Sequence, residues 1–200
     1  MKVIGLTGGI ACGKSTISHM LRELGAKVID ADQISHDLTR PGGDGLPAIR
    51  KAFGDYVFYP DGDLNRNTLA SIVFQNPEER QKLNDALHPL IVKRMQEALE
   101  TRRKMGTLVV VMDVPLLFEV GLEGLADVTV CASAPQAKQL ERLKKRDGLS
   151  LEQSTNRIAS QWPVSEKEKL SDIVIHTDKP LDELQAEVQQ LYHDWVSDET

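Results

Sequence analysis

The sequence has few cysteines and no long hydrophobic run. It contains two cysteines among 200 residues. Cys12 and Cys131 are too few and too far apart in the sequence for a disulfide framework or a metal site, so we expect a reducing, cytoplasmic compartment. Two apolar stretches, 108–112 and 114–118, are separated by Asp113 and are much shorter than a membrane span. We therefore expect no membrane partner.

The sequence also lacks an excess of basic residues. It has 24 Lys and Arg against 30 Asp and Glu, which gives a formal net charge of -6. A protein that grips nucleic acid over a broad surface normally has a basic balance, so we expect no nucleic-acid partner, and any phosphate site must be local. With 40% hydrophobic residues, the chain suits a globular protein with one sizeable core. We expect a monomer.

Short β-branched runs alternate with helical patterns along the chain. Five such runs begin at Lys2, Lys27, Thr107, Asp127 and Asp172. Their uniformly apolar character suits strands that are buried on both faces. The alternation predicts an α/β fold in which a five-stranded parallel sheet is flanked by helices. The first of these helices is expected over Lys14 to Leu24, and Gly25 is placed to end it.

Two segments interrupt the alternation. The first, 33–105, is predicted to be a helical insertion with one hairpin around Asp61 and Gly62 and a long last helix from Pro77 to Met105. The second, 138–165, is predicted to contain two charged helices that break at Asp147 and Gly148. The remaining segments, 1–32, 106–137 and 166–200, are predicted to form the core that contains the sheet.

Residues 8–15 read GGIACGKS and match the phosphate-loop pattern G-x-x-x-x-G-K-[ST] between a predicted strand and a predicted helix. Glycines let successive N–H groups turn toward an anion, and the helix adds its positive end. Lys14 should reach the β and γ phosphates of ATP, Ser15 should bind Mg²⁺, and Thr16 should bond the α-phosphate. The expected ATP-binding residues of this loop are Gly8, Gly9, Ala11, Cys12, Gly13, Lys14, Ser15 and Thr16.

Cys12 lies in this loop, near a helix N-terminus. A thiol in such a position can become acidic and reactive. The alternative is that Cys12 is a small side chain that fills space in the loop. Loss of ATP binding on alkylation would show only that the thiol is close to the nucleotide.

Two aspartates, Asp30 and Asp32, follow the second predicted strand in VIDADQISH. The carboxyl ends of parallel strands open onto the ligand crevice, so a carboxylate there can face the transferred phosphate. If the strand continues to residue 32, alternation puts both carboxylates on one side, one as a base and the other as its support. Capping of the next helix is the alternative role of Asp32. The GTPase motifs D-x-x-G and [NT]-K-x-D do not occur, which disfavours a GTPase switch.

Taken in order, these motifs resemble the dephospho-coenzyme A kinase family. The resemblance is carried by LTGGIACGKST, VIDADQISH, DGDLNRNTLASIVF, LHPLI, DVPLLFE and RDGLSLEQSTNRIASQ, which together span nearly the whole chain. It implies a P-loop kinase fold with a helical, acceptor-binding insertion at 33–105 and a helical lid at 138–165. It also implies transfer of the γ-phosphate of ATP, with Mg²⁺, to the ribose 3′-hydroxyl of dephospho-coenzyme A.

The resemblance further implies roles for individual residues. Asp32 matches the aspartate that orients and deprotonates the acceptor hydroxyl, and Arg142 and Arg146 match cations that close over the triphosphate. With Lys14, these form the expected catalytic set. The residues expected to hold the acceptor are Asp32, Arg66, His88, Pro115, Leu116, Leu117 and Arg157.

Several of these residues have other possible roles. His88 lies among apolar residues and can be an ordinary packed histidine, and Arg66 can be a solvated helix charge. Lys138, Arg142 and Arg146 recur every four residues, which also describes a solvated stripe. Asp113 ends an apolar strand, as expected of a water-mediated Mg²⁺ partner.

The last predicted strand is followed by VIHTDKP, where this family more often has an asparagine and a glycine. His176 is therefore a candidate contact of the adenine base, and the resemblance does not settle which residues read the base. Two other functions stay open: a nucleotide kinase of the same fold, and a non-catalytic ATP-binding module that does not require Asp32.

Overall fold

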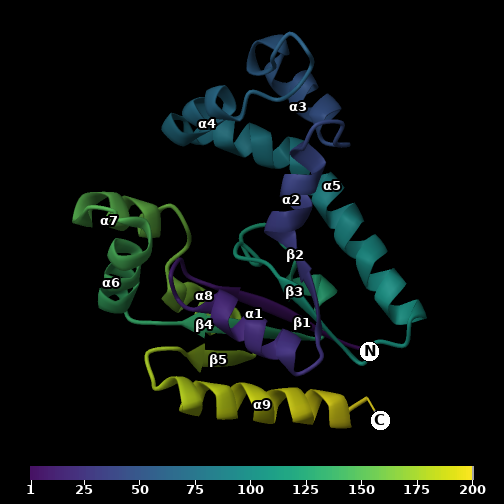
Figure 1. The fold of residues 1–200 in the computed structure, drawn as a ribbon, viewed down its shortest axis with the longest axis vertical. Helices are drawn as coiled ribbons and strands as arrows, with labels where there is room; N and C mark the ends of the chain where they lie inside the picture. Colours follow the sequence, from purple (N-terminus) through teal and green to yellow (C-terminus); the bar gives the residue numbers. More distant parts are fainter. Residues whose placement is uncertain (200) are drawn as a thin grey trace. The chain divides into compact units, whose positions relative to one another are not determined.

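The computed structural model describes residues 1–199, except for the side chains of residues 74 and 75. Its sheet has five parallel strands in the order β2-β3-β1-β4-β5 (Figure 1). The strands are β1 (Lys2–Gly8), β2 (Lys27–Asp30), β3 (Val109–Asp113), β4 (Val128–Ser133) and β5 (Ile173–His176). The predicted five-stranded parallel sheet is confirmed, and β1 with its following loop lies at the centre of the sheet.

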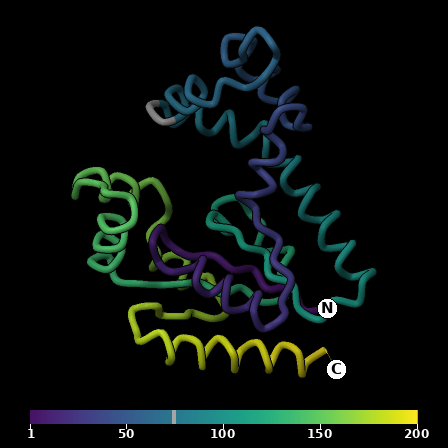
Figure 2. The backbone as a smooth tube through the Cα atoms, viewed as in Figure 1, coloured from purple at the N-terminus to yellow at the C-terminus, as the bar shows by residue number. Residues whose placement is uncertain are grey.

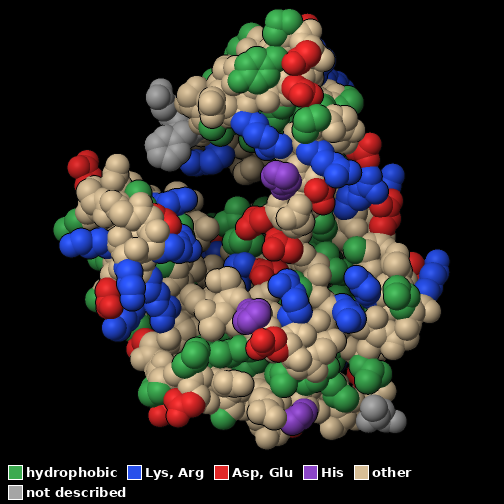
Figure 3. Space-filling view, viewed as in Figure 1, with side chains coloured by type: hydrophobic (Ala, Val, Ile, Leu, Met, Phe, Trp, Pro, Cys, Tyr) green, Lys and Arg blue, Asp and Glu red, His purple; other side chains and the backbone are tan. Residues whose placement is uncertain are grey.

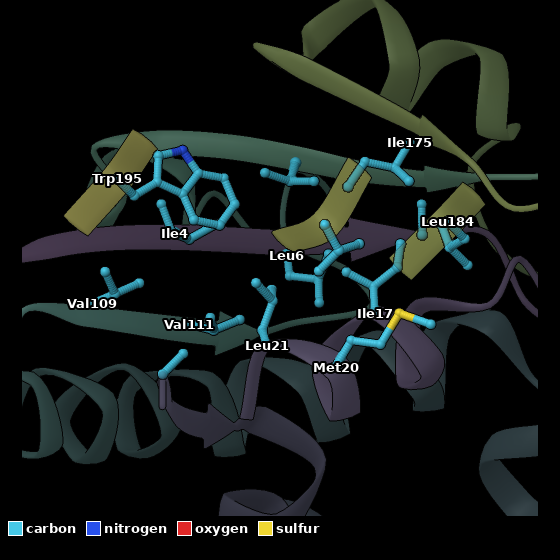
Figure 4. Close-up of a cluster of buried hydrophobic side chains, with 14 residues drawn as sticks. Ile4, Leu6, Ile17, Met20, Leu21, Val109, Val111, Ile175, Leu184 and Trp195 are labelled. Atoms are coloured by element: carbon cyan, nitrogen blue, oxygen red, sulfur yellow. The ribbon is translucent and has the colours of Figure 1, made fainter. Parts of the chain in front are cut away.

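One face of the sheet forms the main apolar core with α1 (Lys14–Glu23) and α9 (Leu181–Ser197). Successive residues of a strand point to opposite faces, so every second strand residue enters this core. Ile4 and Leu6 of β1 pack there with Ile17 of α1 and Trp195 of α9 (Figure 4). On the side of Thr7, α8 (Val164–Leu170) packs against β1 and β4.

The helices of this region end where the sequence predicts. α1 stops at Glu23, and Gly25 follows with a φ of 113°. The two charged helices are α6 (Gln136–Asp147) and α7 (Leu151–Ala159), and Gly148 caps the first with a φ of 66°. Ser150 begins the second with a capping box, in which its side chain accepts the N–H of Gln153.

The chain divides into two compact units. The first comprises Met1–Asp30 and the chain from Leu99 onward, so it includes the sheet and α6 to α9. The second is Ala31–Ala98. The long helix α5 (Pro77–Lys104) begins in the second unit and ends in the first, as the backbone trace shows (Figure 2). The segment predicted as a lid, 138–165, belongs to the first unit.

The second unit is helical, with its own core. Its other elements are α2 (Ala31–Thr39), α3 (Leu46–Phe53), a short 3-10 helix (Asp55–Val57) and α4 (Arg66–Gln75). The buried apolar side chains that cluster in this core are Ile49, Phe53, Val57, Phe58, Leu64, Leu69 and Leu87. A core of this kind, separate from the sheet, lets the unit pack as a small helical domain.

The hairpin predicted around Asp61 and Gly62 is present in a short form. A single antiparallel bridge joins Phe58 to Leu64, and the N–H of Tyr59 donates to the carbonyl of Asp63 at 2.8 Å. Phe58 and Leu64 are buried in the helical core, so the segment is a turn between helices. None of the helices in residues 1–199 combines the length and the apolar character needed to cross a bilayer.

Candidate active site

The phosphate loop connects β1 to α1 and takes a shape that needs its glycines. Gly13 precedes α1 with a φ of 83°, and a Cβ there would lie 2.9 Å from Oγ1 of Thr177. A Cβ on Gly8 would lie 2.5 Å from the carbonyl oxygen of Ala132 in the neighbouring strand. The N–H groups of a first helical turn point toward the N-terminal end of the helix, where they can meet an anion.

Lys14 forms an ion pair with Asp113. Nζ of Lys14, the first residue of α1, contacts Oδ1 of Asp113, the last residue of β3. β3 pairs with β1 in a register that sets Asp113 opposite Leu6, so the carboxylate lies at the carboxyl edge of the sheet. Asp113 is buried and Lys14 half-buried. The sequence assigned these residues to phosphate and metal separately, and the structure brings them together.

Arg142 of α6 connects the phosphate loop to the segment after β5. Nη1 donates to the carbonyl of Ala11 at 3.0 Å and to Oγ1 of Thr177 at 2.9 Å, and Nη2 donates to the carbonyl of Thr177 at 2.7 Å. Thr177 Oγ1 in turn donates to the carbonyl of Cys12 at 2.7 Å. The guanidinium is therefore held in one orientation beside the loop.

A cavity of about 580 Å³ lies along one side of this arrangement. We call it the basic cavity, because four of its lining residues are cations, Arg142, Lys145, Arg146 and Lys179. Figure 3 shows Lys and Arg side chains gathered over α6. The phosphate-loop residues that line the basic cavity are Ala11, Gly13, Ser15 and Thr16. Its charge and its position at a helix N-terminus suit a nucleotide triphosphate.

The segment after β5 lines the basic cavity through residues other than the predicted one. His176 is the last residue of β5 and is exposed, and it is not among the lining residues. Thr177 and Lys179, which follow it, do line the basic cavity. The sequence analysis assigned neither residue to the site. Thr177 is identified by its hydrogen bonds with Arg142, which the sequence does not reveal.

Two arginines of the segment predicted as a lid, Arg146 and Arg157, share one carboxylate. Arg146 donates to both oxygens of Asp147, at 2.7 and 2.9 Å, and Arg157 of α7 donates to Oδ2 of Asp147 at 3.0 Å. The hydrogen bond from Arg146 holds the pKa of Asp147 below its usual value. Arg146 lines the basic cavity, whereas Arg157 does not. Lys138 is exposed and pairs with Glu141 at 2.9 Å on the same helix.

Cys12 is fully buried and is not an acidic thiol. Nε2 of Gln139, on α6, lies 3.1 Å from its sulfur. Burial raises the pKa of the Cys12 thiol above its ordinary value, which overrides the opposing hydrogen bonds. Cys12 therefore fills space under the loop, as the second interpretation of the sequence proposed.

The segment from Pro115 to Glu119 follows β3 and is held by a buried lysine that the sequence analysis did not identify. Lys167 of α8 has no exposed surface. Its Nζ donates to the carbonyl of Pro115 at 2.7 Å and pairs with Oε1 of Glu119 at 2.8 Å. The hydroxyl of Thr7 donates to the same carbonyl at 3.0 Å. Leu117 is buried, whereas Leu116 is partly exposed.

A second cavity, of about 480 Å³, borders the start of the phosphate loop at Gly9 and Ile10. The rest of its wall comes from α6, from the end of α7 and from the turn before α8, and includes Gln139, Gln161 and Trp162. We call it the neutral cavity, because none of the described residues that line it has a charged side chain.

Three of the predicted site residues belong to the second unit. Asp32 lies in the first turn of α2 and is exposed. Arg66 begins α4, and its Nη2 donates to the carbonyl of Thr39 at 2.9 Å. His88 is half-buried in α5, directly before Pro89.

The second strand does not continue to residue 32, so the condition for placing Asp30 and Asp32 by alternation is not met. β2 ends at Asp30, and Ala31 begins α2. Apolar Ala31, Ile34 and Leu38 have helical spacing, which favours the helix over a longer strand. Alternation therefore does not place Asp30 and Asp32 on one side. An aspartate in a first helical turn also interacts favourably with the helix N-terminus.

The residues at the phosphate loop fit Mg²⁺ bound with a nucleotide. Within the described chain, no three His, Cys, Asp or Glu side chains cluster to hold a metal ion by themselves. Mg²⁺ needs few protein ligands when phosphates and water complete its shell. Ser15 in the first turn of α1 and Asp113 at the end of β3 offer the oxygen ligands that it prefers.

The phosphate loop lies between the central parallel strand and the helix that follows it, and cations lie along one side of the loop. This arrangement defines the class of this protein as a P-loop kinase. The model of the family described as dephospho-CoA kinase matches residues 2–183. The chain belongs to the dephospho-CoA kinase family, whose members transfer phosphate to an alcohol group in the final step of coenzyme A biosynthesis.

Relatives of this family cover almost the whole chain. Dephospho-CoA kinase of Geobacillus kaustophilus is 42% identical over 192 residues, and that of Bacillus cereus is 43% identical over 193 residues. Each match covers 96% of this chain and 96% of the relative. The resemblance stated from the motifs is therefore confirmed.

Solved structures agree with the fold. Dephospho-CoA kinase from Campylobacter jejuni superposes with a TM-score of 0.74 at 29% identity over all of both chains. A protein of Thermus thermophilus gives a TM-score of 0.80 at 30% identity, covering 96% of this chain and 97% of its own. A shikimate kinase from Acinetobacter baumannii, at 18% identity and a TM-score of 0.52, shares the fold.

Proposed function

We propose that this chain transfers the γ-phosphoryl group of ATP to the ribose 3′-hydroxyl of dephospho-coenzyme A and releases coenzyme A and ADP. The observation that carries this proposal is the phosphate loop beside the basic cavity, in a chain of the dephospho-CoA kinase family. We also propose a cytoplasmic monomer. Free, buried Cys12 and Cys131 support the cytoplasmic assignment, since thiols stay reduced there.

In this proposal ATP occupies the basic cavity. The N–H groups at the start of α1 meet its phosphates, the hydroxyl of Thr16 bonds the α-phosphate, and Lys14 meets the β and γ phosphates. Arg142 and Arg146 neutralise the charge that spreads over the phosphoryl oxygens. Because Arg142 is already held by three hydrogen bonds, it needs little reorganisation when charge develops.

We propose that Asp32 orients the 3′-hydroxyl and accepts its proton. Phosphoryl transfer depends mainly on positioning and charge neutralisation, so a carboxylate at the attacking oxygen suffices as a base. Asp32 follows the end of β2 by two residues, and β2 neighbours β3 with Asp30 opposite Asp113. This connection along the chain supports its assignment to the phosphate-binding edge of the sheet.

Ser15 and Asp113 are the residues that would hold Mg²⁺ with the nucleotide. The ion supplies charge neutralisation on the β and γ phosphate oxygens when bound. Asp113 has one oxygen at Lys14, so the carboxylate can also orient the lysine toward the phosphates. A lysine held in place by a carboxylate loses less side-chain entropy when the anion binds.

The acceptor residues remain those that the family motifs suggest. Arg66 and His88 are proposed to bind dephospho-coenzyme A from the helical unit, and Pro115, Leu116 and Leu117 are proposed as a wall of its pocket. Lys167 and Thr7 support that wall, because both donate to the carbonyl of Pro115. Arg157 is proposed to support the lid through Asp147. Thr177 and Lys179 replace His176 as the proposed contacts of the donor nucleotide.

A panel of acceptors tests the proposed function. Purified protein with ATP and Mg²⁺ is offered dephospho-coenzyme A, nucleoside monophosphates and shikimate, and the product is identified by mass and by the position of the new phosphate. We expect a 3′-phosphorylated product from dephospho-coenzyme A only. Rapid phosphorylation of a nucleoside monophosphate, with no coenzyme A formed, would replace this proposal by a nucleotide kinase of the same fold.

A further inference from the structure

The neutral cavity has no role in the reaction as described above, although it adjoins the same phosphate loop as the basic cavity. The basic cavity borders Ser15 and Thr16, and the neutral cavity borders Gly9 and Ile10. The two cavities therefore border opposite ends of one loop. A kinase needs two such places, because donor and acceptor must meet at the transferred phosphoryl group from different sides.

The two cavities differ in the charge of their walls. Cations line the basic cavity, which suits phosphates, whereas the described wall of the neutral cavity is uncharged. Trp162 is 46% exposed and offers an aromatic face, and Ile10 and Ile158 add apolar surface to the same wall. An aromatic face with apolar neighbours binds a flat, uncharged ring by stacking. The neutral cavity therefore suits a base and not a phosphate.

Two amides in the wall of the neutral cavity have hydrogen-bond acceptors to spare. Oε1 of Gln139 and Oε1 of Gln161 are buried, and no donor in the described chain reaches either oxygen. Nε2 of Gln139 is already engaged, since it donates to the carbonyl of Ala134 at 3.1 Å. Both oxygens are enclosed by protein, so a ligand N–H reaches one only when the amide turns toward the cavity. A buried acceptor without a donor is unfavourable, which favours that turn when a ligand brings an N–H group. The 6-amino group of adenine is such a donor, whereas a 6-oxo purine presents an acceptor.

We propose that the neutral cavity binds the adenine ring of the acceptor, with Trp162 stacked on the base and Gln161 accepting a hydrogen bond from its 6-amino group. This inference rests on the proposed function. In dephospho-coenzyme A the adenine is attached to the ribose that carries the reacting hydroxyl, whereas the pantetheine arm is separated from that ribose by a diphosphate. When the reacting hydroxyl lies at the phosphate loop, the adenine is therefore closer than the pantetheine arm to a cavity at the edge of that loop.

Steady-state kinetics test the two residues. Trp162→Ala should raise the KM for dephospho-coenzyme A roughly 5- to 100-fold, the range expected for a lost stacking contact. Gln161→Leu should raise it about 5- to 10-fold through a lost hydrogen bond. The KM for ATP should change less than about twofold in both, because the basic cavity is untouched. Trp162→Phe keeps an aromatic ring and should restore most of the affinity.

Two features keep this test specific. The side chain of Trp162 is exposed, and its backbone N–H, which donates to Glu119 at 3.3 Å, is unchanged in all variants, so the fold is preserved. Gln190→Leu is the control for Gln161→Leu. Gln190 is exposed on α9 and lines neither cavity, so this variant should leave both KM values unchanged. A merely structural role of Trp162 would lower kcat and raise both KM values together.

Tryptophan fluorescence reports on the cavity without turnover. The sequence has two tryptophans, so Trp195→Phe leaves Trp162 as the single reporter. In protein saturated with ADP, both dephospho-coenzyme A and AMP should change the emission of Trp162 with saturation. IMP should need at least about 10-fold more ligand, because its 6-oxo group cannot donate to Gln161. The arm alone, as 4′-phosphopantetheine, should have no effect.

The outcomes separate this inference from the proposed function. If the wild-type protein makes coenzyme A but Trp162→Ala leaves the acceptor KM unchanged, the cavity does not hold the acceptor base and only this inference fails. It fails also if ADP alone produces the emission change, or if 4′-phosphopantetheine does. If no coenzyme A is formed, the proposed function fails, and the titrations with AMP and IMP still decide whether the cavity binds adenine.

Discussion

At the scale of single residues, Asp32 is the group on which the proposed chemistry depends most. Asp32→Asn keeps the size of the side chain and removes its basicity. We expect kcat to fall by about 100- to 10,000-fold, the usual contribution of a general base, while the KM for ATP changes little. Measured kcat and both KM values check this.

Asp37→Asn is the matched control for Asp32. Asp37 lies on the same helix, is exposed, and accepts a hydrogen bond from Gln33 at 3.2 Å. We expect its turnover to stay within about twofold of the wild type, as for most surface changes. If Asp32→Asn turned over as fast as this control, Asp32 would not be the base, and a non-catalytic ATP-binding module would become the better interpretation.

A second residue-scale prediction concerns pH. Burial raises the pKa of Cys131 to about 12. A group whose pKa is higher in the folded state than in the unfolded state contributes stability that is fully present below the unfolded pKa. This contribution is lost as the pH rises toward the folded pKa. Above about pH 9, unfolding should therefore release the Cys131 proton, and this residue should lower the free energy of unfolding by up to about 1.4 kcal/mol per pH unit.

Urea unfolding at pH 8 and pH 10 measures this effect. Cys131→Ala, which has no thiol, should lose less stability between the two pH values than the wild type. Equal losses in the two proteins would show that the alkaline sensitivity comes from other groups. Native Cys12 and Cys131 should also resist alkylation at neutral pH, since both are buried and carry raised pKa values.

At the scale of secondary-structure elements, the buried pair of Lys167 and Glu119 fastens α8 to the segment after β3. Lys167→Met should leave Glu119 charged and without its partner, and should lower the free energy of unfolding by about 3–5 kcal/mol. Lys167→Met combined with Glu119→Leu removes both charges and should recover most of that loss. Urea unfolding of the two variants and the wild type measures these differences.

Lys169→Met is the control on the same helix. Lys169 is exposed and pairs with Glu166 at 2.7 Å, so its removal should cost less than about 1 kcal/mol. If Lys167→Met were as mild as this control, the buried pair would not hold the segment, and the support that we assign to Lys167 beneath Pro115 would be wrong.

Among the elements, α1, α6, α7 and α5 could be predicted well, because their signals are local. Gly25 and Gly148 stop helices where only a positive φ continues the chain. The bounds of α2 were not predicted, since the short stretch after β2 is compatible with either a strand or a helix. α8 was not predicted as a separate helix. Its Lys167 supports Pro115, which lies some fifty positions away in the chain, and no local pattern indicates that contact.

At the scale of the whole molecule, nucleotide binding should stabilise the first unit. Saturation at about 100 times the Kd adds about 2.7 kcal/mol, which corresponds to a rise in Tm of roughly 5–10 °C for a protein of this size. Lys14→Met should abolish most of the rise on adding ATP. Thermal unfolding with and without ATP measures it, and the comparison within each variant removes the effect of the broken ion pair with Asp113.

Lys27→Met, at an exposed lysine of β2, serves as the control and should keep the full rise in Tm. A full rise in Lys14→Met as well would mean that ATP binds without the phosphate loop. Since the chain has two compact units with separate cores, the unfolding curve should be checked for two transitions before a single Tm is quoted.

The sequence by itself determined the phosphate loop, the parallel sheet, the helical insertion and the family, because each depends on residue types at short, fixed spacings that the backbone geometry requires. Only the tertiary structure decided which distant residues meet. Lys14 pairs with Asp113, Arg142 joins Ala11 to Thr177, and Lys167 reaches Pro115. The order of strands in the sheet, the packing of α8 on it and the contacts of α6 with the phosphate loop bring these side chains together, and no local pattern encodes that order.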